Sequence, residues 1–312
     1  MIRTTNLTTS DTMLNYIMTN QAKYNEAAEM SSSGKKLTQP SDNAYDAISV
    51  LNVNKQLSQL DGYVSNMKLG TNELNVLDQT EASITTQLQR ANDLAIEASN
   101  QANSPEALSN IKIEIDQIIQ NLKSLGNTNY NGSYIFAGTQ TSTAPFQDVT
   151  DASGNVTGMT YTGTPADKAY QRYIQISENV VSPINVPGDT LLGSYDPVTK
   201  TGQGVFKTLS ELSEALGAQD TTTIRNSIDQ IQSGLNDTAN TRTKFGSIVQ
   251  RFDMTQASIA STVLQLKDYK SSLADVDLSE AATQLASQKI ALQATLSVAA
   301  QTLQGNSLLN YL

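Results

Sequence analysis

The stretch from Ile224 to Leu266, IRNSIDQIQSGLNDTANTRTKFGSIVQRFDMTQASIASTVLQL, decides the fold of this chain. Its apolar residues recur in alternating steps of four and three, and no proline interrupts them. A repeat of about 3.5 residues predicts one long helix with a continuous apolar face for a partner helix. A helix of this length needs partners, because propensity alone does not stabilise it in water. The residues of the apolar face are Ile224, Ile228, Ile231, Leu235, Phe245, Val249, Phe252, Ile259, Val263 and Leu266.

The composition favours a structural protein with a thin core. Hydrophobic residues make up 38% and charged residues 16% of the 312 residues, against averages of roughly 45–50% and 25%. The net charge is −10 without any cluster of basic residues, so neither nucleic acid nor an anionic membrane is an expected partner. Without histidine or cysteine, the chain lacks the commonest general base and metal ligand and all thiol chemistry. We expect no catalytic activity, cofactor or bound metal.

The sequence shows neither a signal peptide nor a membrane span. The first ten residues lack the apolar centre of a signal peptide. No run of about 18 apolar residues is present. Taken alone, these observations indicate a cytoplasmic protein unless a dedicated export machine handles it.

Three helical segments precede a region of different character. Residues 9–33 carry a weak apolar stripe. A second helix is predicted after Pro40, where residues 41–43 are all good N-cap types. Ser104 as cap and Pro105 at the first helical position start a third helix, which Gly126 closes. Residues 138–204 are rich in Gly and Pro and hold short β-type runs, so they predict an inserted β-rich domain. We expect the helical bundle to remain folded without this insert.

Helical character returns at residue 205, which gives the chain a symmetric plan. The prediction is a mainly α protein: an elongated antiparallel bundle or coiled coil made by both halves. Its segments are an N-terminal assembly helix and joint (1–40), the first half of the bundle (41–137), the insert (138–204), the second half (205–275) and a C-terminal assembly helix (276–312). The two assembly helices are expected to pair with each other. Asp277 and Glu280 have capping-box spacing at the start of the last one.

Two motifs resemble the flagellin superfamily and, within it, the hook-associated protein 3 family. The first, SGKKLTQPSD, is similar to a family signature whose P-S-D flagellin itself lacks; the second, GSYIFAGT followed by TAPF, is similar to two further family elements. The resemblance covers all of the chain except the insert. Asn43 and Ala44 depart from the usual Asp-Pro. The motif residues are Ser33, Gly34, Lys35, Pro40, Ser41, Asp42, Gly132, Tyr134, Phe136, Gly138, Pro145 and Phe146.

This resemblance implies a structural adaptor of the bacterial flagellum that works in motility. It would lie outside the cell, at the junction of hook and filament, after type III export without a cleaved signal peptide. The implied partners are copies of itself, the first hook-associated protein, flagellin and an export chaperone.

The terminal stripes are candidates for the assembly interface. They are too thin to fold as isolated helices, so we favour contacts between subunits over ordinary packing within one. The candidate residues are Leu14, Ile17, Tyr24, Leu285, Leu292, Leu296, Leu303, Leu308, Leu309 and Leu312.

Several alternatives stay open. The chain could be a flagellin-like filament subunit, or a coiled-coil stalk that carries a catalytic or sensory β domain. Arg242 at the seam is either a solvated side chain or a charge that sets helix register. Residues 148–155 are predicted as a hairpin turn rather than a calcium loop, because EF-hand spacing is absent. Asp275 and Asp277 are predicted as helix caps rather than a metal pair.

Overall fold

The computed structural model describes residues 2–100, 102–150, 156–164, 171–196 and 201–305. It divides into two compact units, residues 1–59 with 260–312 and residues 60–259, which we describe separately. The mainly α fold with a β-rich insert is confirmed. The unit boundaries fall within the two longest helices rather than at the ends of the predicted segments. Among the described residues, no helix is both long and apolar enough to cross a membrane.

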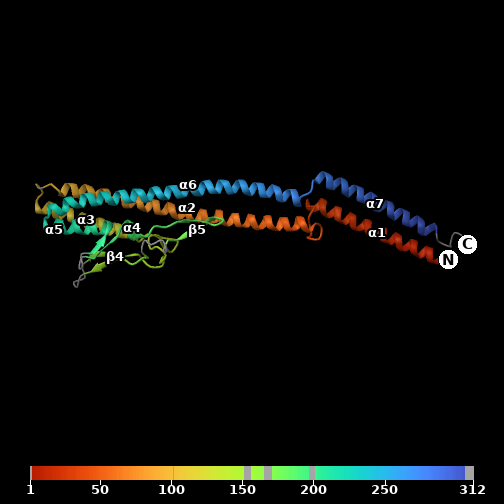
Figure 1. The fold of residues 1–312 in the computed structure, drawn as a ribbon, viewed down its shortest axis with the longest axis horizontal. Helices are drawn as coiled ribbons and strands as arrows, with labels where there is room; N and C mark the ends of the chain where they lie inside the picture. Colours follow the sequence, from red (N-terminus) through yellow and green to blue (C-terminus); the bar gives the residue numbers. More distant parts are fainter. Residues whose placement is uncertain (1, 101, 151–155, 165–170, 197–200, 306–312) are drawn as a thin grey trace. The chain divides into compact units, whose positions relative to one another are not determined.

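Four helical stretches build the first unit. These are α1 (Ile2–Ser33), the start of α2 (Ala44–Ala98), the end of α6 (Thr221–Ala274) and α7 (Leu278–Gly305). Helices α1 and α7 lie side by side, at the red and blue ends of the colour scale (Figure 1). Few large side chains are buried in this unit, and much of its core is alanine, including Ala27, Ala281 and Ala299.

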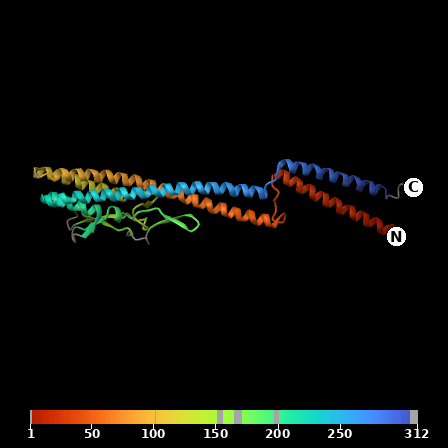
Figure 2. The same ribbon diagram turned by 45° about the horizontal axis from the view of Figure 1, so that its top comes forward.

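The second unit contains a helical core around the rest of α2 and α6. The two helices are antiparallel, because their contacts follow opposite directions along the chain. Gly70 of α2 lies against Phe252 of α6, Asp78 against Arg242, and Leu88 against Gly234. Figure 2 shows the same pairing from a second direction. Helices α3 (Pro105–Gly126) and α5 (Gly204–Ala218) pack on each other and complete the bundle.

Burial along α6 follows the predicted seam. Ile224, Ile231 and Phe252 are buried, and the remaining seam residues are buried or half-buried. Thr238 occupies a seam position with no exposed surface. Its hydroxyl donates to the Gly234 carbonyl at 2.9 Å, so the polar atom is satisfied within its own helix and the seam stays continuous.

The predicted helix signals act largely as expected. Ser104 accepts a hydrogen bond from the Ala107 amide, and Pro105 opens α3, which ends at Gly126. Asn43 accepts amide hydrogen bonds at the start of α2. Helix α5 continues one residue past Gly217, because Gln219 takes the left-handed conformation, with φ 59°, and caps it.

Among the described residues, the insert forms two antiparallel sheets, and a third small sheet lies between α3 and the insert. β1 (Asn129–Tyr130) pairs with β2 (Ser133–Tyr134), and β5 (Tyr173–Ser177) pairs with β6 (Val180–Pro183). The largest sheet has the order β3-β4-β7-β8, from β3 (Phe146–Thr150), β4 (Val156–Tyr161), β7 (Ser194–Asp196) and β8 (Thr201–Gln203). A short helix, α4 (Gly188–Leu191), precedes β7.

The core of the insert is continuous with that of the helices. The Phe146 ring lies 5.3 Å, between centroids, from the Phe206 ring of α5. A Cβ on Gly126 of α3 would come within 2.6 Å of the Phe146 ring. This shared packing argues against our expectation that the bundle would remain folded without the insert.

Candidate assembly surface and joint

The α1–α7 pair carries all of the predicted assembly residues that the structure describes. Ile17 and Tyr24 on α1, and Leu285 and Leu292 on α7, are half-buried. Leu14 and Leu296 expose 54% and 47% of their surface. Leu303 lies near the end of α7, and Leu308, Leu309 and Leu312 lie outside the described residues.

This pair is held together by small and polar groups as well as by the half-buried stripe. The Asn20 side-chain amide donates to the Thr295 hydroxyl at 2.6 Å. Further large apolar side chains remain exposed on the same two helices: Tyr16, Met18, Ile290 and Val298. The predicted stripes are therefore only partly covered within one chain, and the pair presents apolar surface outward.

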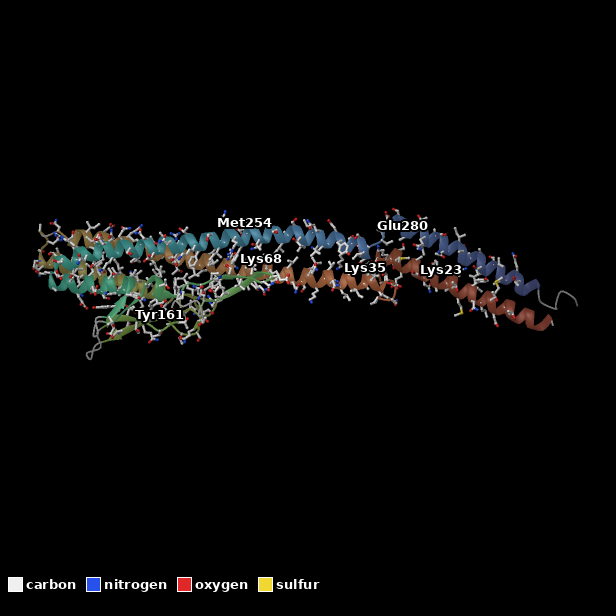
Figure 3. The ribbon with its side chains drawn as sticks, viewed as in Figure 1. Lys23, Lys35, Lys68, Tyr161, Met254 and Glu280 are labelled. Carbon is white, nitrogen blue, oxygen red and sulfur yellow. The ribbon has the colours of Figure 1, made fainter. Side chains whose placement is uncertain are left out.

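The first motif forms the joint where α1 ends. Gly34 has φ 68°, a conformation that favours glycine, and its carbonyl accepts a hydrogen bond from the Val276 amide at 3.0 Å. The Lys36 amide donates to the Ala274 carbonyl at 2.8 Å. The backbone of Lys35, a residue labelled in Figure 3, forms an isolated antiparallel β-bridge with that of Asp275. The breaks after α1 and after α6 are thus joined by backbone hydrogen bonds.

Asp42 holds the rest of this motif in a closed loop. One of its carboxylate oxygens accepts hydrogen bonds from the Gln39 amide at 2.7 Å, the Thr38 amide at 3.0 Å and the Thr38 hydroxyl at 3.1 Å. These bonds, the one from Gln39 first, lower the pKa of Asp42 below its usual range. Pro40 and Ser41 lie inside the loop, exposed, and Ser33 accepts the Lys35 amide before it.

The second motif belongs to the core of the other unit. Asn131 and Gly132 both have positive φ and form the turn between β1 and β2, as the Asn-Gly pair favours. Phe136 is fully buried, and its carbonyl accepts the Tyr161 hydroxyl at 2.9 Å and the Gly188 amide at 2.8 Å. Tyr161 is labelled in Figure 3, and burial raises its pKa.

The remaining residues of this motif are also structural. Gly138 has φ 69°, and a side chain there would overlap with Thr164. Tyr134 is half-buried in β2, while Pro145 and Phe146 are buried. The Asn127 side chain bonds both the amide and the carbonyl of Phe146, at 2.9 and 2.8 Å. These contacts fasten the insert to the end of α3.

Several charged contacts were not predicted from the sequence. Arg242 donates to both oxygens of Asp78 on α2, at 2.8 and 3.3 Å, which favours the interpretation that it sets helix register. Glu73 pairs with Arg172 just before β5. Glu81 is fully buried on α2. Burial first, and then the neighbouring Asp78, raise the pKa of Glu81 to about 8. Acidic residues on a predicted helix give no sequence signal for such burial.

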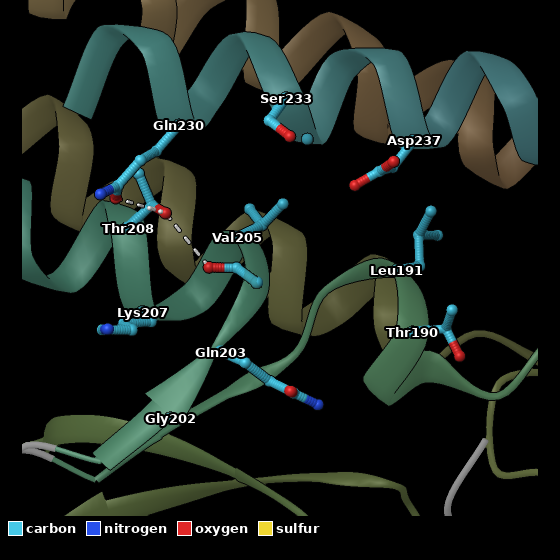
Figure 4. Close-up of a pocket in the computed structure, with 12 residues that line it drawn as sticks. Thr190, Leu191, Gly202, Gln203, Val205, Lys207, Thr208, Gln230, Ser233 and Asp237 are labelled. Atoms are coloured by element: carbon cyan, nitrogen blue, oxygen red, sulfur yellow. Dashed lines mark hydrogen bonds between the residues drawn. The ribbon is translucent and has the colours of Figure 1, made fainter. Parts of the chain in front are cut away.

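A shallow cleft of about 370 Å³ separates β8 and α4 from α5 and α6. Figure 4 shows Lys207 and Asp237 at its sides and the hydrogen bond from Thr208 to Gln230, 3.2 Å long, that joins α5 to α6. Lys207 lies 3.9 Å from Glu211 of its own helix. Among the described residues, no group of three metal-ligating side chains comes together. Asp148 is paired with Lys123, and the Asp277 carboxylate accepts the Ser279 amide at the start of α7.

These features define a helical protein whose two terminal helices pack on each other and are connected to the other helices through a hydrogen-bonded joint. The bacterial flagellin N-terminal helical region matches residues 4–141, and the bacterial flagellin C-terminal helical region matches residues 228–312. The chain belongs to the flagellin family.

Two curated relatives and one solved structure refine this likeness. The chain is 29% identical over 133 residues to flagellar hook-associated protein 3 of Escherichia coli, a match that covers 42% of each chain. It is 24% identical over 298 residues to flagellin of Listeria monocytogenes, covering 95% of this chain and 94% of that one. A flagellar hook-associated protein from Vibrio parahaemolyticus, described as putative, has a similar fold, with a TM-score of 0.64 and 17% identity over 75% of this chain and all of that one.

Proposed function

We propose that this protein is a structural adaptor of the bacterial flagellum that joins a hook-associated protein to the flagellin filament. The observation that carries the proposal is the loop closed by Asp42. It contains the P-S-D element, which resembles a signature of the hook-associated protein 3 family that flagellin lacks. The identity to the E. coli hook-associated protein, although it spans two fifths of that protein, supports the same assignment.

The assembly interface in this proposal is the α1–α7 pair. Leu14 and Leu296 are exposed beside half-buried Ile17 and Leu292, so a neighbouring helix could cover them. Each large apolar side chain that becomes fully buried on assembly would contribute about 1.5–3 kcal/mol. Copies of this chain on either side, with the first hook-associated protein and flagellin at the two ends, are the partners that this surface would serve.

The remaining parts of the proposal follow from the family. The protein would act outside the cell, after type III export without a cleaved signal peptide, and a chaperone would hold its C-terminal segment beforehand. We infer that it has no catalytic activity, since its relatives are structural proteins of the flagellum.

A filament subunit is the second candidate function. The flagellin of L. monocytogenes aligns with nearly the whole chain, whereas the hook-associated relatives align with less than half of it. This candidate predicts that the purified protein forms long homopolymers.

The two candidates are separated by supplying purified protein to isolated hooks. An adaptor should add a limited number of copies to hook ends and should be required there before flagellin polymerises. A strain without the protein should assemble hooks that lack filaments and should release flagellin into the medium. Long filaments of this protein alone, viewed by electron microscopy, would contradict the adaptor function.

A further inference from the structure

Two carboxylates and one arginine meet where α2 crosses α6. Asp78 and Glu81 are three residues apart on α2, so they project from the same helix face about one turn apart. Arg242 of α6 binds Asp78 with two hydrogen bonds, of 2.8 and 3.3 Å. The Asp78 and Arg242 side chains are 42% and 38% exposed.

Glu81 differs sharply from Asp78 in its surroundings. The residue has no exposed surface, and neither carboxylate oxygen has a hydrogen-bond partner among the described residues. An ionised carboxylate without a partner is strongly disfavoured in such a place, because it loses its hydration without compensation. The carboxyl therefore stays neutral at pH values where an ordinary glutamate is ionised.

Two charged side chains, Asp78 and Arg242, act on the ionisation of Glu81. Asp78 opposes ionisation of Glu81, and Arg242 favours it. Elsewhere in this unit, Lys123 of α3 pairs with Asp148, and Arg172 before β5 pairs with Glu73.

We propose that Asp78 and Glu81 are alternative partners for Arg242, and that a proton on Glu81 selects between them. With Glu81 neutral, Arg242 pairs with the outer carboxylate of Asp78, as in this structure. When Glu81 releases its proton to solvent, the guanidinium moves inward to the buried carboxylate, and Asp78 becomes fully solvated. The α2–α6 contact thus has two arrangements that differ by one proton.

The absence of histidine and cysteine from the sequence makes this device easy to observe. No side-chain type in this sequence has an ordinary pKa between about 5 and 8, so a titration in that range points to a perturbed group such as Glu81. In that interval the folded protein carries a proton on Glu81 that the unfolded chain has lost. The stability that Glu81 contributes is therefore greatest below its unfolded pKa and falls as pH rises toward the folded one, with up to a tenfold increase in the unfolding constant per pH unit. A free α-amino group also titrates near this range, but it is shared by all variants.

The test uses the full-length protein with ¹³C-labelled glutamate carboxyl groups, titrated by NMR. In the wild type, one glutamate signal should titrate near pH 8, the value that burial gives Glu81. Glu81→Gln should remove that signal and flatten the pH dependence of urea unfolding. Glu97→Gln, at an exposed position on the same helix, should change neither. Asp78→Asn should lower the pKa of Glu81 by more than one unit, because the repulsion disappears and Arg242 is released.

The proposal has two clear points of failure. If every glutamate of the wild type titrates below pH 6, the buried proton does not exist, and this result does not depend on the folding of any variant. If the pKa of Glu81 stays near 8 in Asp78→Asn, Arg242 does not transfer to it. Neither result bears on the junction function, which rests on the joint and the terminal helices.

Discussion

Phe252 provides the sharpest test of how α2, α6 and the insert are held together. Its side chain has no exposed surface. It faces Gly70 of α2, where an added Cβ would lie 3.1 Å from the Phe252 ring, 2.6 Å from Ile174 and 3.2 Å from Ile184. Glycine at this position lets the ring and the β5–β6 hairpin meet on the surface of α2. The substitution Phe252→Ala would therefore leave a void bounded by three elements.

The expected cost of Phe252→Ala can be worked from this geometry. Removing a fully buried Phe side chain forfeits about 1.5–3 kcal/mol of transfer free energy, and an unfilled cavity adds about 24 cal/mol per Å³. The surrounding structure can fill this void only in part, because the Arg242–Asp78 and Arg251–Ser182 contacts fix α6 to its neighbours. We expect a loss of about 3–5 kcal/mol, or about 6–20 °C in Tm for a unit of this size.

The assay is urea and thermal unfolding of the full-length protein followed by far-ultraviolet circular dichroism. Met254→Ala is the matched control, because Met254 lies two residues away on α6 and is 62% exposed (Figure 3). It should change the free energy of unfolding by about 0.5 kcal/mol or less. If the two variants are destabilised equally, the packing described around Gly70 is wrong.

Four further predictions concern caps, loops and assembly. Ser104→Ala should destabilise α3 by about 0.5–2 kcal/mol in urea unfolding, because the cap on the Ala107 amide is lost; an unchanged midpoint would contradict this role. Gly193→Ala should disrupt the β7–β8 pairing, since φ is 70° and the new Cβ would overlap with the Gln203 carbonyl. Its control is Gly217→Ala, where the new Cβ meets nothing closer than Lys112 at 3.7 Å. This control should be neutral or should stabilise the protein by up to about 1 kcal/mol. Asp42→Asn should speed hydrogen exchange at the Thr38 and Gln39 amides at neutral pH. Because folding lowers the pKa of Asp42, the stabilisation by its carboxylate is present above the ordinary aspartate pKa and is lost as pH falls through the native one. The exchange rates of wild type and variant should therefore converge in acid. Leu14→Ser with Leu296→Ser, both at exposed positions, should leave the melting temperature nearly unchanged but weaken addition to hooks; normal addition would remove these residues from the interface.

The helices could be predicted because their signals are local. The seam of α6 follows from spacing alone, and Ser104, Pro105 and Asn43 mark helix starts through contacts within four residues. The turn at Asn131 and Gly132 is likewise set by its own two residues.

What escaped prediction depends on contacts between distant parts of the chain. Glu81 reads as an ordinary surface acid, and its burial comes from tertiary packing that sequence spacing does not encode. Gly70 lies in a helical pattern where glycine is merely unfavourable, yet it admits two elements that are more than 100 residues away. The abrupt change in Gly and Pro content suggested a separable insert, but Phe146 joins it to α3 and α5.

The two connectors at the joint are unequal in length, and this inequality limits the reach of the terminal helices. Three residues, 275–277, link α6 to α7, while ten residues, 34–43, link α1 to α2. A fully extended chain spans about 3.3–3.6 Å per residue, so the shorter connector permits about 10 Å and the longer about 35 Å. The short connector keeps the start of α7 close to the end of α6. The long connector has more residues than it needs, and the hydrogen bonds of Asp42 hold part of it in a closed loop. Release of the Asp42 carboxylate would free only the part of the long connector after Lys36, because Gly34 and Lys36 are bound separately to Val276 and Ala274.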